Sequence, residues 1–147
     1  MNVSKFNGRP VGCGGFINIT RAAKKLVFCG TFTAGGLELE ISKGSGGGKL
    51  TIKQEGRSRK FVEQVEQITF NGRDAALRHQ NVLSVPERAV CDLPADGLEL
   101  IEIAPGIDLE RDVLAHMSFR PILREVRTMD PKLFEEQWGG LAAAIGK

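Results

Sequence analysis

The feature that most constrains the fold is a short, unbroken apolar run from Leu26 to Cys29, which ends at Gly30. A continuous apolar run bounded by glycine is typical of a strand buried on both faces, as strands in parallel sheets are. The preceding residues, Thr20 to Lys25, have a helix-forming composition. We therefore predict an α/β fold in which this strand is covered on both sides.

Alternating patterns predict further strands. Apolar side chains at Leu37, Leu39 and Ile41 alternate with polar ones, and Leu50 and Ile52 repeat the pattern after a glycine-rich stretch. This arrangement indicates a half-buried β-hairpin whose flexible tip lies at residues 44–48. Three more strands are predicted at residues 82–85, 89–93 and 98–103. The spacing in residues 61–70 fits either a strand or a helix, and both interpretations stay open.

Two capping signals predict short helices near the C-terminal end. Asp108 is a suitable N-cap for a helix that runs through Leu109 and Val113 to Met117, with acidic residues in its first turn. The pair Asp130-Pro131 places an N-cap before a proline at the first helical position. This last helix is expected to carry Leu133, Phe134 and Trp138, and to stop at Gly139-Gly140, before an alanine-rich end expected to be loose.

Composition excludes several classes of function. The formal charge is only +2 and the charged residues are interspersed, which argues against a nucleic-acid-binding protein. No apolar run approaches the roughly 20 residues that a membrane-spanning helix needs, and no secretion signal opens the chain. The cysteines, at positions 13, 29 and 91, are odd in number and not spaced as pairs, which indicates a reducing cytoplasm.

The sequence contains no complete motif for phosphate binding or metal binding. The stretch around Gly48-Lys49 resembles a phosphate-binding loop, but Lys43 and Leu50 stand where the motif needs a glycine and a hydroxyl, so a hairpin tip is favoured. His79 and His116 have no companions at metal-ligand spacing, and no metal site is predicted. A basic patch could hold an anion, although a charged hairpin edge is the favoured interpretation. The patch consists of Lys53, Arg57, Arg59 and Lys60.

Several blocks, in order, resemble family I coenzyme A transferases of the acetate/propionate type, in the part beyond their catalytic glutamate. The matching blocks are residues 2–6, 12–19, 24–37, 65–72, 87–90 and 97–117. The resemblance implies an open-sheet catalytic domain, with its C-terminal part at residues 1–123 and a tail with a short helix at 124–147. It also implies an acyl-CoA:carboxylate CoA-transferase, acting on short-chain acyl-CoA and carboxylic acids, that is an oligomer when intact.

The resemblance also implies site residues. In the family a glutamate attacks the acyl-CoA thioester, and the reaction proceeds through a glutamyl-CoA thioester. Each step forms an oxyanion that needs fixed N–H donors. The Gly14-Gly15 loop is expected to place backbone N–H groups near the reacting carbonyl, or else to be a plain tight turn. Thr33, Gly35 and Gly36 are expected to line the cleft. Coenzyme A enters only as part of the substrate, and no bound cofactor is implied.

Three departures from the family pattern bear on activity. The nucleophile of the family lies in a Ser-Glu-x-Gly motif, whereas the nearest match, Glu55-Gly56, follows Gln54. Pro86 and Cys91 replace an expected threonine and phenylalanine, so Pro86 must sit at a strand end or edge. We expect residues 1–147 to be inactive alone. They are then a subunit or binding module that completes the cleft of an N-terminal partner, or a non-functional remnant.

Overall fold

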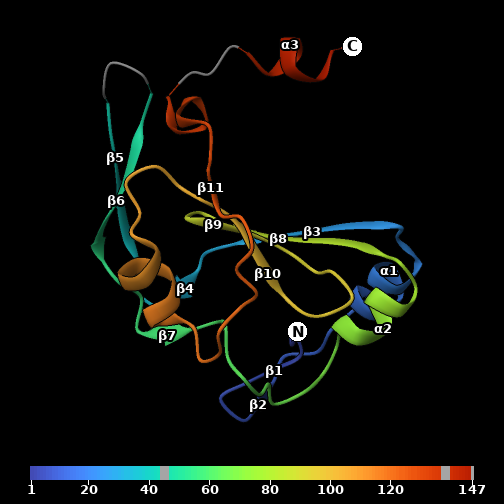
Figure 1. Cartoon of the computed structure of the whole chain (residues 1–147). Helices are drawn as coiled ribbons and strands as arrows, with labels where there is room; N and C mark the ends of the chain where they lie inside the picture. The colour runs from blue at the N-terminus through green and yellow to red at the C-terminus, as the bar shows by residue number, and fades with distance from the viewer. Residues whose placement is uncertain (44–46, 137–139, 147) are drawn as a thin grey trace.

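The computed structural model describes residues 1–43, 47–136 and 140–146. Its centre is a mixed sheet of five strands in the order β11-β10-β9-β8-β3 (Figure 1). Strand β3 pairs with β8 in parallel and β11 pairs with β10 in parallel, whereas β8, β9 and β10 are antiparallel neighbours. The strands are β3 (Lys25–Gly30), β8 (Asn81–Pro86), β9 (Ala89–Asp92), β10 (Glu99–Ile103) and β11 (Arg127–Thr128).

Two-stranded ribbons and short helices surround the sheet. The ribbons pair β1 (Lys5–Phe6) with β2 (Arg9–Pro10), β4 (Thr33–Ala34) with β7 (Ser58–Arg59), and β5 (Glu38–Ser42) with β6 (Lys49–Gln54). The helices are α1 (Phe16–Ala22), α2 (Gly72–Leu77) and α3 (Leu141–Ile145), with η1 (Leu109–Val113), η2 (Leu114–His116) and η3 (Pro131–Phe134) as π- or 3₁₀-helical turns. The expected α/β fold class is confirmed.

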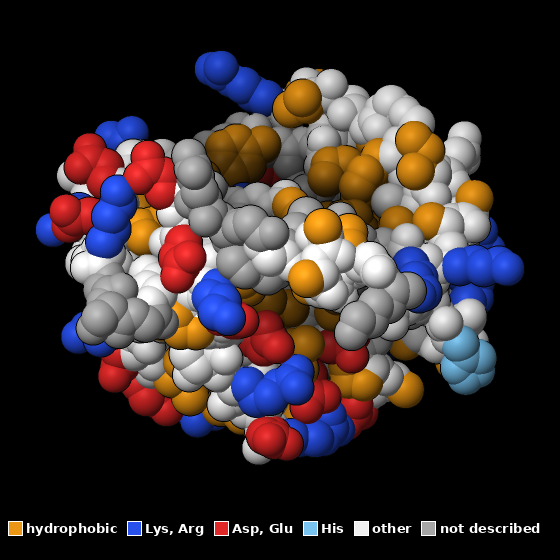
Figure 2. Space-filling view, turned by 90° about the horizontal axis from the view of Figure 1, so that it is seen from above, with side chains coloured by type: hydrophobic (Ala, Val, Ile, Leu, Met, Phe, Trp, Pro, Cys, Tyr) orange, Lys and Arg blue, Asp and Glu red, His pale blue; other side chains and the backbone are white. Residues whose placement is uncertain are grey.

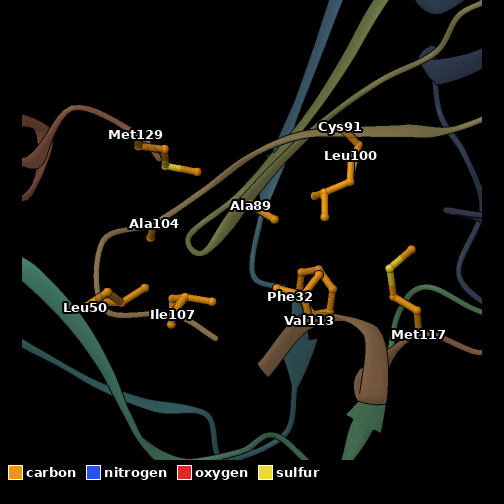
Figure 3. Packing of buried hydrophobic residues seen from close by; sticks show 10 residues of the cluster. All are labelled: Phe32, Leu50, Ala89, Cys91, Leu100, Ala104, Ile107, Val113, Met117 and Met129. Carbon is orange, nitrogen blue, oxygen red and sulfur yellow. The ribbon is translucent and has the colours of Figure 1, made fainter. Parts of the chain in front are cut away.

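Two hydrophobic clusters hold these elements together. The larger one joins β9 and β10 to β6 and to the η1–η2 segment (Figure 3). Its buried members are Phe32, Leu50, Ala89, Cys91, Leu100, Ala104, Ile107, Val113, Met117 and Met129. The smaller cluster lies under β3 and β8, where α1 and α2 pack (Figure 1), and contains Leu26, Phe70, Ala75 and Val82.

The prediction that β3 is buried on both faces is wrong for the residues described. Leu26 is 8% exposed, but its neighbour Val27 is 57% exposed. The reason is positional, because β3 is the last strand of the sheet and α1 and α2 cover only one of its faces. The helix before β3 is also earlier than expected, since α1 begins at Phe16 and ends at Ala22.

The predicted hairpin is confirmed as β5 and β6, but it is not half-buried along both strands. Leu50 of β6 is 3% exposed, whereas Leu39 and Ile41 of β5 are 37% and 52% exposed. The expected tip falls partly on residues 44–46, which lie outside the described residues. Residues 61–70 form neither of the two structures left open, because they follow a series of bends. Strands β8, β9 and β10 match their predictions, and Pro86 ends β8 as expected.

The predicted helix from Asp108 to Met117 begins as expected but is not α-helical. Asp108 caps it by accepting a hydrogen bond from Arg111 N, and the segment then forms the η1 and η2 turns, which end at His116. In an α-helix the carbonyl of Asp112 would accept the N–H of residue 116. Here that carbonyl accepts a hydrogen bond from the Arg88 side chain, and Met117 N donates to the Leu114 carbonyl in a 3₁₀ turn, so no α-helix continues beyond Asp112.

The last predicted helix is confirmed at its start. Asp130 accepts a hydrogen bond from Lys132 N, and Pro131 is the first residue of η3, which is a short 3₁₀ helix ending at Phe134. Trp138 and Gly139 lie outside the described residues. The alanine-rich end, which is expected to be loose, instead forms the short helix α3.

Candidate functional site

Arg88 occupies the centre of a polar cluster inside the protein. It lies in the turn between β8 and β9, and its side chain is fully buried. Its guanidinium donates to both carboxylate oxygens of Glu55, at 2.6 and 3.1 Å, to Glu87 Oε1 at 2.7 Å and to the Asp112 carbonyl at 3.0 Å. It also lies 5.0 Å from the centre of the Phe32 ring. A buried guanidinium needs such pairing, because an isolated buried charge is strongly destabilising.

Glu55 follows β6 and uses both of its carboxylate oxygens. Besides Arg88, Oε1 accepts hydrogen bonds from the Thr33 hydroxyl and from Gly56 N, and Oε2 lies 3.4 Å from His116 Nε2. Burial acts to raise the pKa of Glu55, but the hydrogen bonds from Arg88 and Thr33 outweigh it and leave the pKa lowered. Glu55 is therefore an ionised carboxylate whose lone pairs are occupied, which suits a structural anchor better than a nucleophile.

The segment Thr33 to Gly36, which we predicted to line a cleft, is attached to this cluster. Thr33 is fully buried, and its hydroxyl donates to Glu55 and accepts from Gly56 N at 3.1 Å. Gly35 and Gly36 are exposed, with φ angles of +81° and +95° that favour glycine. Thr33 is therefore internal, Ala34 is partly exposed and the two glycines lie at the surface, and the cleft-lining role of the segment stays a prediction.

Gly56 fixes the distance between this segment and the chain after β6. A Cβ on Gly56 would lie 2.6 Å from the Ala34 carbonyl oxygen and 2.7 Å from Thr33 Oγ1, closer than real side chains approach. On the other side of the turn, Arg57 N donates to the Gly35 carbonyl at 3.2 Å. The two chain segments are thus pressed together at a point where only a glycine fits.

The second predicted site, Gly14-Gly15, lies in an exposed loop between β2 and α1. Gly14 has φ +50°, and a Cβ added there would meet nothing within 4 Å. Gly15 is the N-cap position of α1. In Figure 1, α1 and β4 lie on opposite sides of the molecule, so the structure does not bring Gly14 together with Gly35 and Gly36.

Other charged regions are occupied by structural contacts. In the basic patch, Lys53 pairs with Glu40 across the hairpin, and Lys60 donates to the Thr31 carbonyl at 2.6 Å. A cavity of about 440 Å³ lies at the ends of α1 and α2, and its lining residues are Arg21, Ala22, Ala23, Lys24, Arg78, His79 and Gln80. Two of its lining side chains, Arg78 and Gln80, donate to carbonyls of α1 at 2.9 and 2.6 Å, and therefore cap that helix.

Sequence reasoning missed the cluster itself. In the sequence, Glu55-Gly56 is only an incomplete match to the nucleophile motif, and Glu87-Arg88 is only part of a block that resembles the family. The partners Glu55 and Arg88 are 33 positions apart, and no local pattern joins them. The available signal was an arginine between two apolar strands. Within the described ranges, no group of three or more histidine, cysteine or acidic side chains could hold a metal ion. No described helix is long and apolar enough to cross a membrane.

Comparisons with known proteins give relatives, although no family model matches the chain. It is 50% identical over 135 residues to the acetate CoA-transferase YdiF of Escherichia coli K12, covering 91% of this chain and 25% of that protein. It is 48% identical to the caffeate CoA-transferase of Acetobacterium woodii, covering 28% of that protein. A crystal structure of the acyl-CoA transferase YdiF of E. coli O157:H7, in a thioester complex with CoA, superposes with a TM-score of 0.89 over 95% of this chain and 27% of that one, at 48% identity.

Proposed function

This chain matches about a quarter of the length of the CoA-transferases named above, and on that premise we propose that it forms part of an enzyme that moves coenzyme A between carboxylic acids. The single observation that carries the proposal is the superposition, at 48% identity, on a transferase crystallised as a CoA thioester. The substrates would be an acyl-CoA and short carboxylic acids, with coenzyme A as the transferred group rather than a resident cofactor.

We propose that the residues that select the acyl group lie in the rest of the enzyme. Two relatives with nearly the same identity to this chain, 50% and 48%, are named for different acids, acetate and caffeate. A segment with nearly the same identity to both relatives is not expected to contain the residues that distinguish between the two acids. We therefore propose that residues 1–147 supply the scaffold and the general geometry of the site, and that they do not determine acyl specificity.

We propose that the nucleophilic glutamate comes from outside residues 1–147. In the proposed reaction a glutamate carboxylate attacks the thioester carbonyl, which forms a mixed anhydride and releases CoA thiolate. The thiolate then attacks the glutamyl carbonyl of that anhydride, which releases the carboxylic acid and leaves a glutamyl-CoA thioester. The occupied oxygens of Glu55 support its exclusion from this role, and those of Glu87 do the same, because they accept from Arg88 and from Phe32 N at 2.7 Å each.

The contribution of this chain would be at the two glycine segments. The exposed, sterically open loop at Gly14-Gly15 could bring backbone N–H groups to the oxyanion that each step forms. The segment at Gly35-Gly36, held by Thr33 and Glu55, would line the cleft. Their separation in this structure means that a substrate touching both must be long or that only one of them lies at the reacting carbonyl.

The working form would be a complex or a single longer chain in the cytoplasm, with this part completing a cleft, and the intact enzyme would be an oligomer. The second candidate, a non-functional remnant, predicts exposed apolar surface. The 57% exposure of Val27 is expected both for a part that completes a larger enzyme and for a non-functional remnant. A measurement of activity must therefore distinguish the two.

A chimera tests the proposal. Residues 1–147 would replace the matching quarter of the E. coli acetate CoA-transferase, and transfer of CoA from acetyl-CoA to a second carboxylate would be measured. The proposal predicts exchange by the chimera and none by residues 1–147 alone. A folded chimera without exchange would show that this chain is a remnant.

A further inference from the structure

Beyond its first register pair, Lys25 and Asn81, one face of the β3–β8 pair is apolar and at least partly exposed. Parallel partners Val27 and Leu83, and likewise Cys29 and Val85, lie opposite each other in the register, so these four side chains share one face. Val27 is 57% exposed, Cys29 is exposed, and Leu83 and Val85 are partly exposed. We call these four residues the open face. On the other side of the same strands, Leu26 and Val82 are buried under α1 and α2, at 8% and 5% exposure.

The open face is unusual for this kind of strand. Parallel strands occur almost only with both faces covered, because the connections between them pack helices on the sheet. The sequence of β3 fits that rule, since its central residues are apolar on both faces. Figure 2, which views the molecule from above relative to Figure 1, shows hydrophobic side chains in its upper right part, with Lys, Arg and His side chains along the right edge. The sequence of β3 is therefore typical of a strand that is buried on both faces, although one of its faces is exposed in this structure.

The outer edge of β3 is also unpaired within the described residues, because β3 ends the strand order of the sheet. All six of its residues are in register with β8 on the inner side. Proteins protect exposed edge strands with charges, prolines or bulges. In β3 the only charged residue is Lys25, at the first position, and the strand contains no proline. The edge is thus suited to pair with another strand.

The length of the relatives identifies the occupant. This chain superposes closely on a solved CoA-transferase but spans only 27% of it, so about three quarters of that protein have no counterpart here. We propose that the open face and the outer edge of β3 are the docking surface for the rest of the CoA-transferase, which adds a strand beside β3 and covers Val27, Cys29, Leu83 and Val85 with apolar side chains. This inference rests on the proposed function.

The reactivity of Cys29 reports whether the open face is covered. Its thiol lies within the open face, so a maleimide can reach it in the isolated chain. In the chimera with the E. coli transferase the proposal predicts that Cys29, followed by peptide mass mapping, is labelled at least tenfold more slowly. Equal labelling rates in the folded chimera and the isolated chain would overturn the proposal.

A pair of matched variants gives an independent readout. Val27→Arg places a charge on the open face, whereas Leu77→Arg places one on α2, where Leu77 is 81% exposed. Both positions are exposed, so neither change should unfold the isolated chain. The open-face variant should restore fast labelling of Cys29 in the chimera or prevent the chimera from folding, and Leu77→Arg should do neither. If both variants behave like the parent chimera, the proposal is wrong.

Three further outcomes are distinguishable. If light scattering finds the isolated chain as a dimer that Val27→Arg converts to a monomer, a second copy occupies the open face and the proposal is wrong. Protection of Cys29 in a chimera that has no exchange activity would support the docking surface while the proposed function fails. Activity without protection of Cys29 would keep the function and overturn the docking surface.

Discussion

Arg88 binds Glu55 through two hydrogen bonds, of 2.6 and 3.1 Å, that join the turn after β8 to the end of β6. Because the Arg88 side chain is fully buried, the pair fixes the end of the β5–β6 hairpin against the turn between β8 and β9 of the central sheet. The same Glu55 accepts from Thr33, so the position of the Thr33–Gly36 segment depends on this pair. The polar cluster thus links the scaffold to a segment that we propose to be at the substrate cleft.

Arg88→Met should be strongly destabilising. It leaves the carboxylates of Glu55 and Glu87 facing each other without a cation, and removing one partner of a buried pair costs about 3–5 kcal/mol. Arg124→Met is the matched control, because Arg124 pairs with Asp96 and Glu99 at the surface and should change stability by about 1 kcal/mol or less. Urea denaturation measures both. A loss below about 1 kcal/mol for Arg88→Met would mean that the cluster is not a structural anchor.

The stability contributed by Glu55 should depend on pH. Its pKa is lowered in the folded chain, so its contribution is present above its ordinary value of 4.5 and is lost as the pH falls through the folded value. The stability difference between the wild type and Glu55→Gln should therefore shrink when the pH is lowered from 5 to 3. Denaturation curves at a series of pH values measure it, with Glu110→Gln as a surface control. A difference that stays constant over this range would contradict the assignment.

The glycines at positions 56 and 14 should respond differently to alanine. Gly56→Ala places a Cβ 2.6 Å from the Ala34 carbonyl and should cost about 3 kcal/mol, because backbone must move. Gly14→Ala meets no neighbour, and its cost comes only from φ +50°, about 1–2 kcal/mol. In the chimera Gly14→Ala should nevertheless lower CoA exchange more than tenfold if that loop binds the oxyanion. Unchanged exchange would leave Gly14 with the role of a plain turn.

The thiols should differ in reactivity in the folded chain. Burial raises the pKa of the Cys91 thiol to about 12, so almost no thiolate forms at pH 8, and the side chain is inaccessible. Cys29 is exposed and should react with a thiol reagent at once. Cys91 should react only at the rate of unfolding, which urea accelerates. Fast reaction of Cys91 without denaturant would show that the core around β9 opens readily.

Much of the fold follows from local patterns, and the differences have physical causes. Alternation and turn residues predicted β8, β9, β10 and the β5–β6 hairpin, and the caps at Asp108 and Asp130 are where the sequence placed them. Sequence pattern does not give the hydrogen bond from Arg88 to the Asp112 carbonyl in the segment after Asp108, because the two residues are 24 positions apart. It also does not give the exposure of Val27, since that depends on which elements are present to cover β3.

The candidate site was predictable only by resemblance. Gly14-Gly15 and Gly35-Gly36 are indicated as site residues only by the resemblance to a family, and Gly14, Gly35 and Gly36 have positive φ angles, which favour glycine. The cluster that supports one of these segments combines Glu87 and Arg88 with the distant Glu55. The position of Arg88 between two apolar strands is visible in the sequence, but nothing in the sequence pairs it with Glu55, which is 33 positions away.

The central claim is that residues 1–147 contain no carboxylate that takes part covalently in CoA transfer. The most direct test is peptide mass mapping after incubation with acetyl-CoA and borohydride, applied to the isolated chain and to the chimera. Borohydride would reduce a glutamyl-CoA thioester and mark the glutamate that formed it. We predict no modified glutamate in residues 1–147 of either protein, and one in the remaining part of the chimera. Modification of Glu55, or of any other glutamate in residues 1–147, would contradict the account.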